Sequence, residues 1–221
     1  MSEVALDNST FSLVVLAVVI GFAPAALVLM TAFIKISVVF FILRNAIGIQ
    51  QTPGNMVLSS IAAVLAIYIS APVLTETYSI LREPTLTYQS IGDWEEAFRR
   101  GSVPVQQFLL RNTTEVERTF FASAAQKTWG PGAAIEVDTQ SLFILIPAFV
   151  MHELTAAFKI GFLIYIPFLA IDLIIANILM ALGMITLSPV VIGVPFKLLL
   201  FIVVDGWSML VRGLILSYAV T

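Results

Sequence analysis

Seven charged residues lie inside or at the ends of long apolar stretches of this sequence. They are Lys35, Glu153, Lys159, Asp172, Lys197, Asp205 and Arg212. A charge surrounded by hydrocarbon is costly, so such residues usually pair with one another or take part in function. We therefore expect contacts between helices or subunits, with Glu153 paired to Lys159 or Lys35. Asp205 is expected to pair with Lys197.

Asp172 lies within an aliphatic run, Ala170–Ile174. Its side chain is too short to reach a membrane interface, which predicts a buried salt bridge or hydrogen bond, with a proton relay as the alternative. The longer side chains of Lys35, Lys197 and Arg212 can instead extend along apolar surface to water. Both interpretations stay open for these three residues.

The usual constellations of catalytic residues are missing from the sequence. The segment 152–156 begins like a zinc-protease helix with His152 and Glu153, but Ala156 occupies the position of the second histidine. The chain has one histidine and no cysteine, and it contains no nucleophile elbow, phosphate loop or dinucleotide fingerprint. We expect no enzymatic activity, no metal and no cofactor, and we expect His152 to be a packing residue with one hydrogen bond.

Four apolar tracts, over residues 11–43, 57–81, 141–184 and 190–220, enclose a charged island at 82–140. A helix of about 20 apolar residues spans a bilayer, and each tract reaches that length. Hydrophobic residues make up 59% of the chain and charged residues 11%, against about 25% charged in soluble domains. The net charge of -3 leaves no basic stripe for nucleic acid. The composition therefore predicts an integral membrane protein, with lipid and not nucleic acid as a partner.

Each tract is interrupted by glycine or proline. The interruptions are Gly21, Pro24, Pro72, Gly161, Pro167, Gly193 and Pro195. Broken helices in a membrane survive where protein or a water-filled cavity satisfies the freed backbone groups. We expect an all-α fold of membrane helical hairpins in a packed assembly. The third tract is long enough to predict a bent hairpin turning near Pro167, so four or five spans are open.

The pattern divides the chain into an amino-terminal hairpin (1–81), a helical extramembrane insertion (82–140) and a carboxy-terminal hairpin (141–221). Thr114 and Glu117 have capping-box spacing, which predicts a helix over 114–127, and Ser102 with Pro104 predicts another ending near Asn112. The placement of lysine and arginine favours termini and insertion outside the cytoplasm. The acidic amino end, without a basic segment, predicts a first spanning segment that is not cleaved as a leader.

Several short strings then carry a resemblance. The most specific lie between 147 and 162, with Pro147-Ala148-Phe149, Glu153-Leu154 and Ala157-Phe158-Lys159-Ile160-Gly161-Phe162. Others are Arg44-Asn45-Ala46, Pro167-Phe168, Ile171-Asp172-Leu173, Leu182-Gly183-Met184, Ser188-Pro189, Pro195-Phe196-Lys197-Leu198 and Asp205-Gly206-Trp207. In this order, and over nearly the whole chain outside the island, they resemble the FliP/SctR family of export-gate proteins from flagella and injectisomes.

The resemblance implies a non-enzymatic subunit of the type III secretion export apparatus in the bacterial inner membrane, forming part of the entry pore for unfolded secreted proteins. It implies a pentamer that joins SctS/FliQ-like and SctT/FliR-like membrane proteins and an SctU/FlhB-like switch protein. In this family the assembly protrudes to the periplasmic side. The short chain without a leader resembles the injectisome branch more than the flagellar one.

The family commonly places a run of methionines on a pore loop between the positions of Gly183 and Pro189. Here the run is Met184, Ile185, Thr186 and Leu187, so the first methionine is kept and the next three differ. Five such loops would form an apolar ring, and apolar constrictions can gate by excluding water. The resemblance thus implies that these four residues form the gate, while the pattern alone also allows a plain helix-ending turn.

Two other classes of protein remain open from the residues. A secondary transporter would use Asp172 and Glu153 to bind a coupling ion near broken helices, but it predicts an internal repeat that the sequence lacks. A membrane scaffold without a pore would differ from an export gate only in the Met184 loop.

Overall fold

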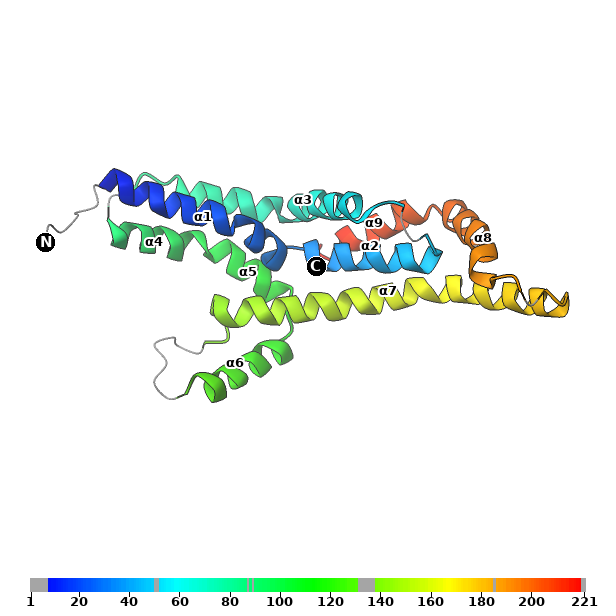
Figure 1. The fold of residues 1–221 in the computed structure, drawn as a ribbon. Coiled ribbons are helices and arrows are strands. Elements are labelled where there is room, and N and C mark those ends of the chain that lie inside the picture. Colours follow the sequence, from blue (N-terminus) through cyan, green and yellow to red (C-terminus); the bar gives the residue numbers. More distant parts are fainter. Residues whose placement is uncertain are drawn as a thin grey trace, which may run out of the picture. The chain divides into compact units, whose positions relative to one another are not determined.

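The computed structural model describes residues 8–49, 52–86, 88, 90–130, 138–184 and 186–219. Within these residues every regular element is an α-helix and no strand occurs, which confirms the all-α prediction (Figure 1). The helices are α1 (Asn8–Met30), α2 (Phe33–Ile47), α3 (Asn55–Leu81), α4 (Ile91–Gly101), α5 (Val103–Arg111), α6 (Glu115–Trp129), α7 (Leu142–Ala181), α8 (Pro189–Val203) and α9 (Gly206–Leu216).

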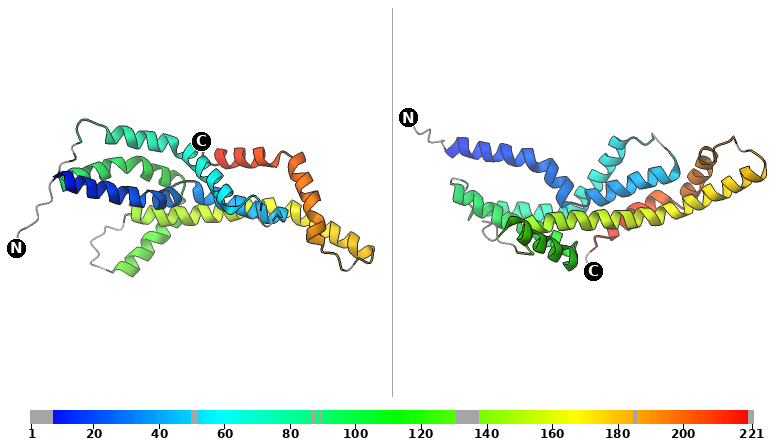
Figure 2. Two further views of the ribbon diagram at one scale, coloured as in Figure 1. Left: turned by 45° about the horizontal axis from the view of Figure 1, so that its top comes forward. Right: turned by 60° about the horizontal axis from the view of Figure 1, so that its bottom comes forward.

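In the described part of the chain, α3 and α7 are long and apolar enough to cross a membrane. The pair α8 and α9, bent by 61°, becomes a third span if it is counted as one. The predicted hairpin near Pro167 is wrong, because α7 is one continuous helix of 40 residues (Figure 2). The first tract is instead divided between α1 and α2, so the chain breaks at residues 31–32 and not at its prolines.

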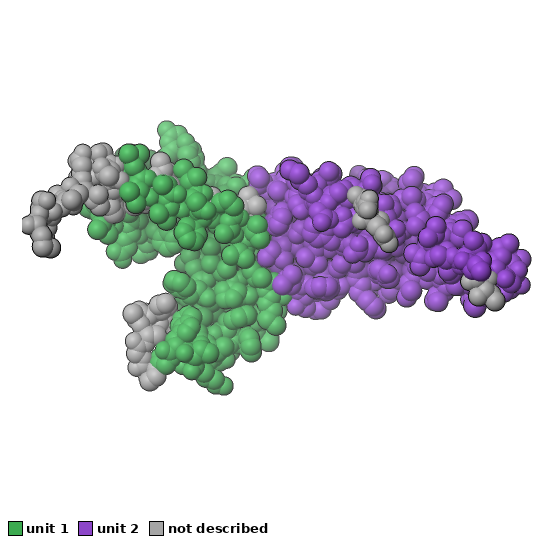
Figure 3. Space-filling view, in the orientation of Figure 1, with its two compact units in different colours: residues 1–31, 70–152 green, residues 32–69, 153–221 purple. Residues whose placement is uncertain are grey.

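The chain forms two compact units (Figure 3). Unit 1 comprises residues 1–31 and 70–152, and unit 2 comprises residues 32–69 and 153–221. The boundary passes through α3 and α7, so these units divide the chain differently from the three predicted segments. Packing joins residues far apart in sequence, which a division by composition alone does not detect.

Unit 1 contains the helices of the charged island. The predicted helix over 114–127 is α6, and the helix starting after Ser102 is α5, which ends at Arg111 with Asn112 as its carboxy-terminal cap. The predicted capping box is wrong, since the Thr114 side chain makes no capping hydrogen bond. Glu117 instead lies 3.2 Å from Nδ1 of His152. A capping box forms at the start of α4, between Ser90 and Asp93.

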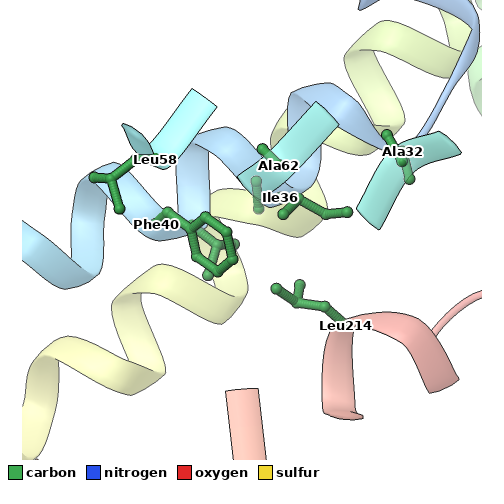
Figure 4. Packing of buried hydrophobic residues seen from close by; sticks show 9 residues of the cluster. Ala32, Ile36, Phe40, Leu58, Ala62 and Leu214 are labelled. Carbon is green, nitrogen blue, oxygen red and sulfur yellow. The ribbon is translucent and has the colours of Figure 1, made fainter. Parts of the chain in front are cut away.

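Unit 2 has its core along one side of α2. Ile36 and Phe40, one helical turn apart, are fully buried against α3 and against Leu214 of α9 (Figure 4). Gly161 of α7 allows a close approach to α2, because a Cβ atom there would lie 2.4 Å from Cδ1 of Ile42. This core brings α2, α7 and α9 together and so places the charged residues of unit 2.

Candidate pore loop and buried charge pairs

A buried ion pair joins α2 and α7 inside unit 2. Nζ of Lys35 lies 3.0 Å from Oε1 of Glu153, and their side chains are 7% and 0% exposed. Lys35 is therefore the partner of Glu153, and Lys159 is not. The helical repeat explains this choice, since side chains face each other at spacings of three or four residues and Glu153 and Lys159 are six apart.

Tyr218 completes this pair from beyond the end of α9. Its hydroxyl donates a hydrogen bond to Oε2 of Glu153, and its ring centroid lies 3.9 Å from Nζ of Lys35. The phenol donates and the carboxylate accepts in this bond, because an ionised carboxylate has no hydrogen to donate. Glu153, Lys35 and Tyr218, called the Glu153 triad below, therefore join three separate segments of unit 2.

A second ion pair joins α7 to α8. Nζ of Lys197 lies 2.6 Å from Oδ2 of Asp172 and also donates a hydrogen bond to the backbone oxygen of Ala46 at 3.1 Å. The Lys197 side chain is 3% exposed and that of Asp172 is 21% exposed. The salt bridge expected at Asp172 is confirmed. The pairing of Lys197 with Asp205 is wrong, because Nζ of Lys197 is held by Asp172 of α7 and by the backbone oxygen of Ala46.

Gly193 was not singled out as part of this pair. A Cβ atom at Gly193 would lie 3.0 Å from Oδ1 of Asp172 and 3.8 Å from Cε of Lys197. The glycine therefore makes room for the carboxylate against α8. Its spacing of four residues before Lys197 is the sequence signal that would have placed both on one helical face.

The three other charges that the sequence analysis named in the apolar tracts are exposed. Lys159 on α7, Asp205 before α9 and Arg212 on α9 form no ion pair within the described part of the chain. Asp205 has a left-handed backbone conformation, φ 50°, where the chain turns from α8 into α9. The predicted roles of these residues in contacts between subunits stay predictions.

The loop after α7 begins with a specific helix-ending motif. The amide of Met184 donates to the backbone oxygen of Leu179 at 2.9 Å, and the amide of Gly183 donates to that of Met180 at 3.1 Å. These two bonds, with φ 70° at Gly183, form a Schellman motif, which satisfies carbonyls at the end of the helix. A glycine suits this position because side chains disfavour a positive φ.

Two apolar side chains of the loop are exposed. Met184 is 46% exposed and Leu187 is 44% exposed, with Thr186 exposed between them. Ile185, the fourth predicted gate residue, lies outside the described residues. Pro189 then starts α8 at a position where a missing amide hydrogen costs nothing. The loop is therefore a short connection with defined ends that presents methionine and leucine outward.

In unit 1, His152 has the packing role expected for it. Its Nδ1 and Oε1 of Glu117 are 3.2 Å apart and partly buried, which links α6 to α7. No group of three or more His, Cys, Asp or Glu side chains able to hold a metal occurs among the described residues.

Helices of bilayer length with buried lysine–carboxylate pairs define the chain as an α-helical membrane protein. The family model described as the FliP family matches residues 16–214, and the chain belongs to this family. It is 46% identical to the "Probable translocation protein y4yL" of Sinorhizobium fredii, over 96% of each chain. It is 42% identical to the "Yop proteins translocation protein R" of Yersinia pestis, over 94% of this chain and 95% of that one. It is also 42% identical to the "Hypersensitivity response secretion protein HrcR" of Ralstonia nicotianae, over 96% of this chain and 100% of that one.

Proposed function

We propose that this chain is a core subunit of a type III secretion export gate of the injectisome kind, in the bacterial inner membrane. It forms part of the pore through which unfolded proteins leave the cytoplasm. Membership of the FliP family supports this proposal, as do the names of the relatives, which refer to translocation of Yop proteins and to secretion in the hypersensitivity response. The bilayer-length helices α3 and α7 support the membrane location.

The subunit acts within a larger assembly in this proposal. Five copies form a ring, joined by SctS/FliQ-like and SctT/FliR-like membrane proteins and an SctU/FlhB-like switch protein, and the assembly protrudes to the periplasmic side with the 82–140 insertion. The amount of apolar surface supports assembly, since large side chains such as Phe158, Phe162 and Leu163 of α7 are more than 60% exposed in the single chain. Such surface is covered either by lipid or by other subunits.

The observation that carries the pore assignment is the loop after α7. Its start is held by the Gly183 turn, while Met184 and Leu187 are exposed. A ring of such loops provides a flexible apolar seal, because methionine is unbranched and adapts its shape to whatever it contacts. The seal excludes water at rest and deforms around a passing polypeptide. Ile185 and Thr186 belong to the same proposed seal.

The test is a polar substitution in this loop. Met184→Asn should let small ions leak through the resting assembly, because an amide holds water in the constriction. Ion permeability of cells or vesicles containing the complete export apparatus measures the effect, with secretion recorded in parallel. Met56→Asn is the matched control, since Met56 at the start of α3 is 85% exposed and lies outside the loop. Equal permeability in Met184→Asn and wild type would count decisively against the seal.

The buried charges have a structural role in this proposal. Glu153, Asp172 and Lys197 join helices within one subunit, as their partners in unit 2 support, and exposed Asp205 joins neighbouring subunits. No observation favours the transporter alternative, because each of its two carboxylates is already paired with a lysine. A coupling ion would have to displace that lysine before it could bind.

A further inference from the structure

Unit 2 contains an apolar cavity that neither the pore loop nor the ion pairs use. Its volume is about 550 Å³, and every side chain that lines it is apolar. The walls come from α2, α7, α8 and α9 and include Ile160, Pro167, Phe168, Gly206, Met209 and Gly213. A cavity with no hydrogen-bonding side chain disfavours polar ligands, since a buried polar group without a partner is costly. Its occupant must therefore be hydrocarbon.

The cavity is open to the surroundings of unit 2. Met209 lines it and is 67% exposed, so the same side chain borders both the cavity and the surface. At Gly213 no side chain covers the cavity wall, and a Cβ atom built there would have no atom within 4 Å. Three of the four helices around the cavity meet the length and hydropathy requirements for a span, namely α7 and, counted together, the bent pair of α8 and α9. The hydrocarbon available to such helices in a membrane is lipid.

The two ends of the cavity differ in the charges beside them. Ile160 packs in one cluster with Leu214, whereas Phe168 packs with Phe201, at 6.5 Å between ring centroids. Segments α7 and α9 therefore run in opposite directions along the cavity. One end is bordered by Ile160 and Gly213, and the other by Phe168 and Gly206.

Two exposed cations of unit 2 belong to the first end. Lys159 precedes Ile160, and Arg212 precedes Gly213; both are exposed and form no ion pair among the described residues. At the other end the carboxylate Asp205 precedes Gly206, and Arg44 follows Leu43, with its guanidinium donating hydrogen bonds to Oδ1 of Asn55 and to the backbone oxygen of Pro53. Seven residues separate Asp205 from Arg212, which is about 10 Å along a helix. The Arg212 end thus has two cations, whereas the opposite charges of Asp205 and Arg44 offset each other at the other end, so an anionic group is attracted to the Arg212 end.

We propose that this cavity binds one acyl chain of a glycerophospholipid, whose phosphate contacts Arg212 and Lys159. The chain lies against Met209 and the bare wall at Gly213, and it runs from Arg212 toward Gly206. Basic side chains beside clefts between membrane helices bind anionic lipid headgroups in this way. A free phosphate would interact with the two basic side chains but would not fill the apolar cavity. A neutral lipid would fill the cavity but would not form an ion pair with these side chains.

The test is native mass spectrometry of the full-length assembly in mild detergent, with phosphatidylglycerol or diacylglycerol added. Wild type should retain phosphatidylglycerol in preference to diacylglycerol. Arg212→Gln should lower the apparent affinity for phosphatidylglycerol about fivefold, which is the effect of about one basic side chain at a lipid surface. Gly213→Leu, which fills the cavity, should abolish retention of both lipids.

Matched controls come from residues away from the cavity. Arg111→Gln removes an exposed arginine of unit 1, and Gly54→Leu adds the same side chain at another glycine with open space around its Cβ position. Both should retain phosphatidylglycerol as wild type does. Equal retention of phosphatidylglycerol by wild type, Arg212→Gln and Gly213→Leu would overturn the proposal. A Gly213→Leu variant that no longer forms the oligomer but keeps its lipid would also overturn it, because the cavity would then bind a second copy of the chain. Arg212→Gln changes only an exposed side chain, so its result decides the matter even if Gly213→Leu fails to assemble.

Discussion

Glu153 is a buried charge whose partners come from two other segments of unit 2. The carboxylate is fully buried and receives Lys35 from α2 and the Tyr218 hydroxyl from beyond α9. Breaking a buried pair by removing one partner usually costs about 3–5 kcal/mol, because the other charge stays buried without compensation. The Glu153 triad is therefore important for the stability of unit 2 mainly because removing one member would leave another charge buried without a partner.

Replacing Glu153 by glutamine should destabilise the protein strongly, because Lys35 then stays buried without its counter-ion. Thermal unfolding of the detergent-solubilised protein, followed by tryptophan fluorescence, measures this loss. A double-mutant cycle with Lys35→Met should give a coupling energy of about 0.5–3 kcal/mol. Lys159→Gln is the control and should leave the unfolding temperature nearly unchanged, since Lys159 is exposed and has no ion pair in the described structure. If Lys159→Gln coupled to Glu153→Gln and Lys35→Met did not, the assignment of the pair would be wrong.

At the scale of helices, Gly161 determines how closely α7 approaches α2. A Cβ atom at this position would overlap three atoms of the Ile42 side chain, at 2.4, 2.9 and 3.1 Å. One of these is Cβ of Ile42, which cannot move without its backbone. The interface that places Lys35 beside Glu153 thus depends on a residue with no charge of its own.

Gly161→Ala should lower the free energy of unfolding by about 1–3 kcal/mol, the usual cost of adding a methyl group to a close-packed interface. The same unfolding measurement in detergent detects it. Gly21→Ala in α1 serves as the control, because a Cβ atom there meets nothing within 4 Å, and alanine in a helix is favoured over glycine. A Gly161→Ala protein as stable as Gly21→Ala would show that α2 and α7 are not held at this distance.

At the scale of the whole molecule, the proposed function requires other subunits. Lipid or other subunits can cover the exposed apolar side chains on α3 and α7, but lipid hydrocarbon does not match the exposed charge of Asp205. Residues far apart in sequence converge in unit 2, so the buried pairs are complete within one chain. Assembly should therefore use the exposed Asp205 and leave the buried charges undisturbed.

The chain extracted in mild detergent should form a discrete homo-oligomer that captures the small membrane proteins of the export apparatus. Native mass spectrometry of the chain alone, and then with those proteins, measures the stoichiometry. Asp205→Lys should reduce the oligomer, since it reverses a charge proposed to lie between subunits, whereas Lys127→Glu, a reversal at an exposed residue of the insertion helix α6, should not. A stable monomer or dimer that ignores the partners would argue against the export gate.

Much of this protein follows from its sequence alone. Apolar tracts of bilayer length and a charged island predict an all-α membrane protein, because hydrophobicity and helix length are local properties of the chain. Its short motifs, in their order along the chain, resemble those of the FliP/SctR family, and the comparisons confirm the family. A local signal also places the start of α5, where Pro104 lies in the first turn, although the Ser102 side chain makes no capping hydrogen bond.

Only the tertiary structure decides which charges meet. Lys35 and Glu153 lie more than a hundred residues apart, and their pairing depends on the close contact of α2 with α7, which no local pattern contains. The same holds for Lys197, which turns inward to Asp172 and the Ala46 carbonyl and not toward Asp205. Burial makes an unpaired charge costly, so the packing of helices selects the partner, whereas the sequence determines only which residues are charged.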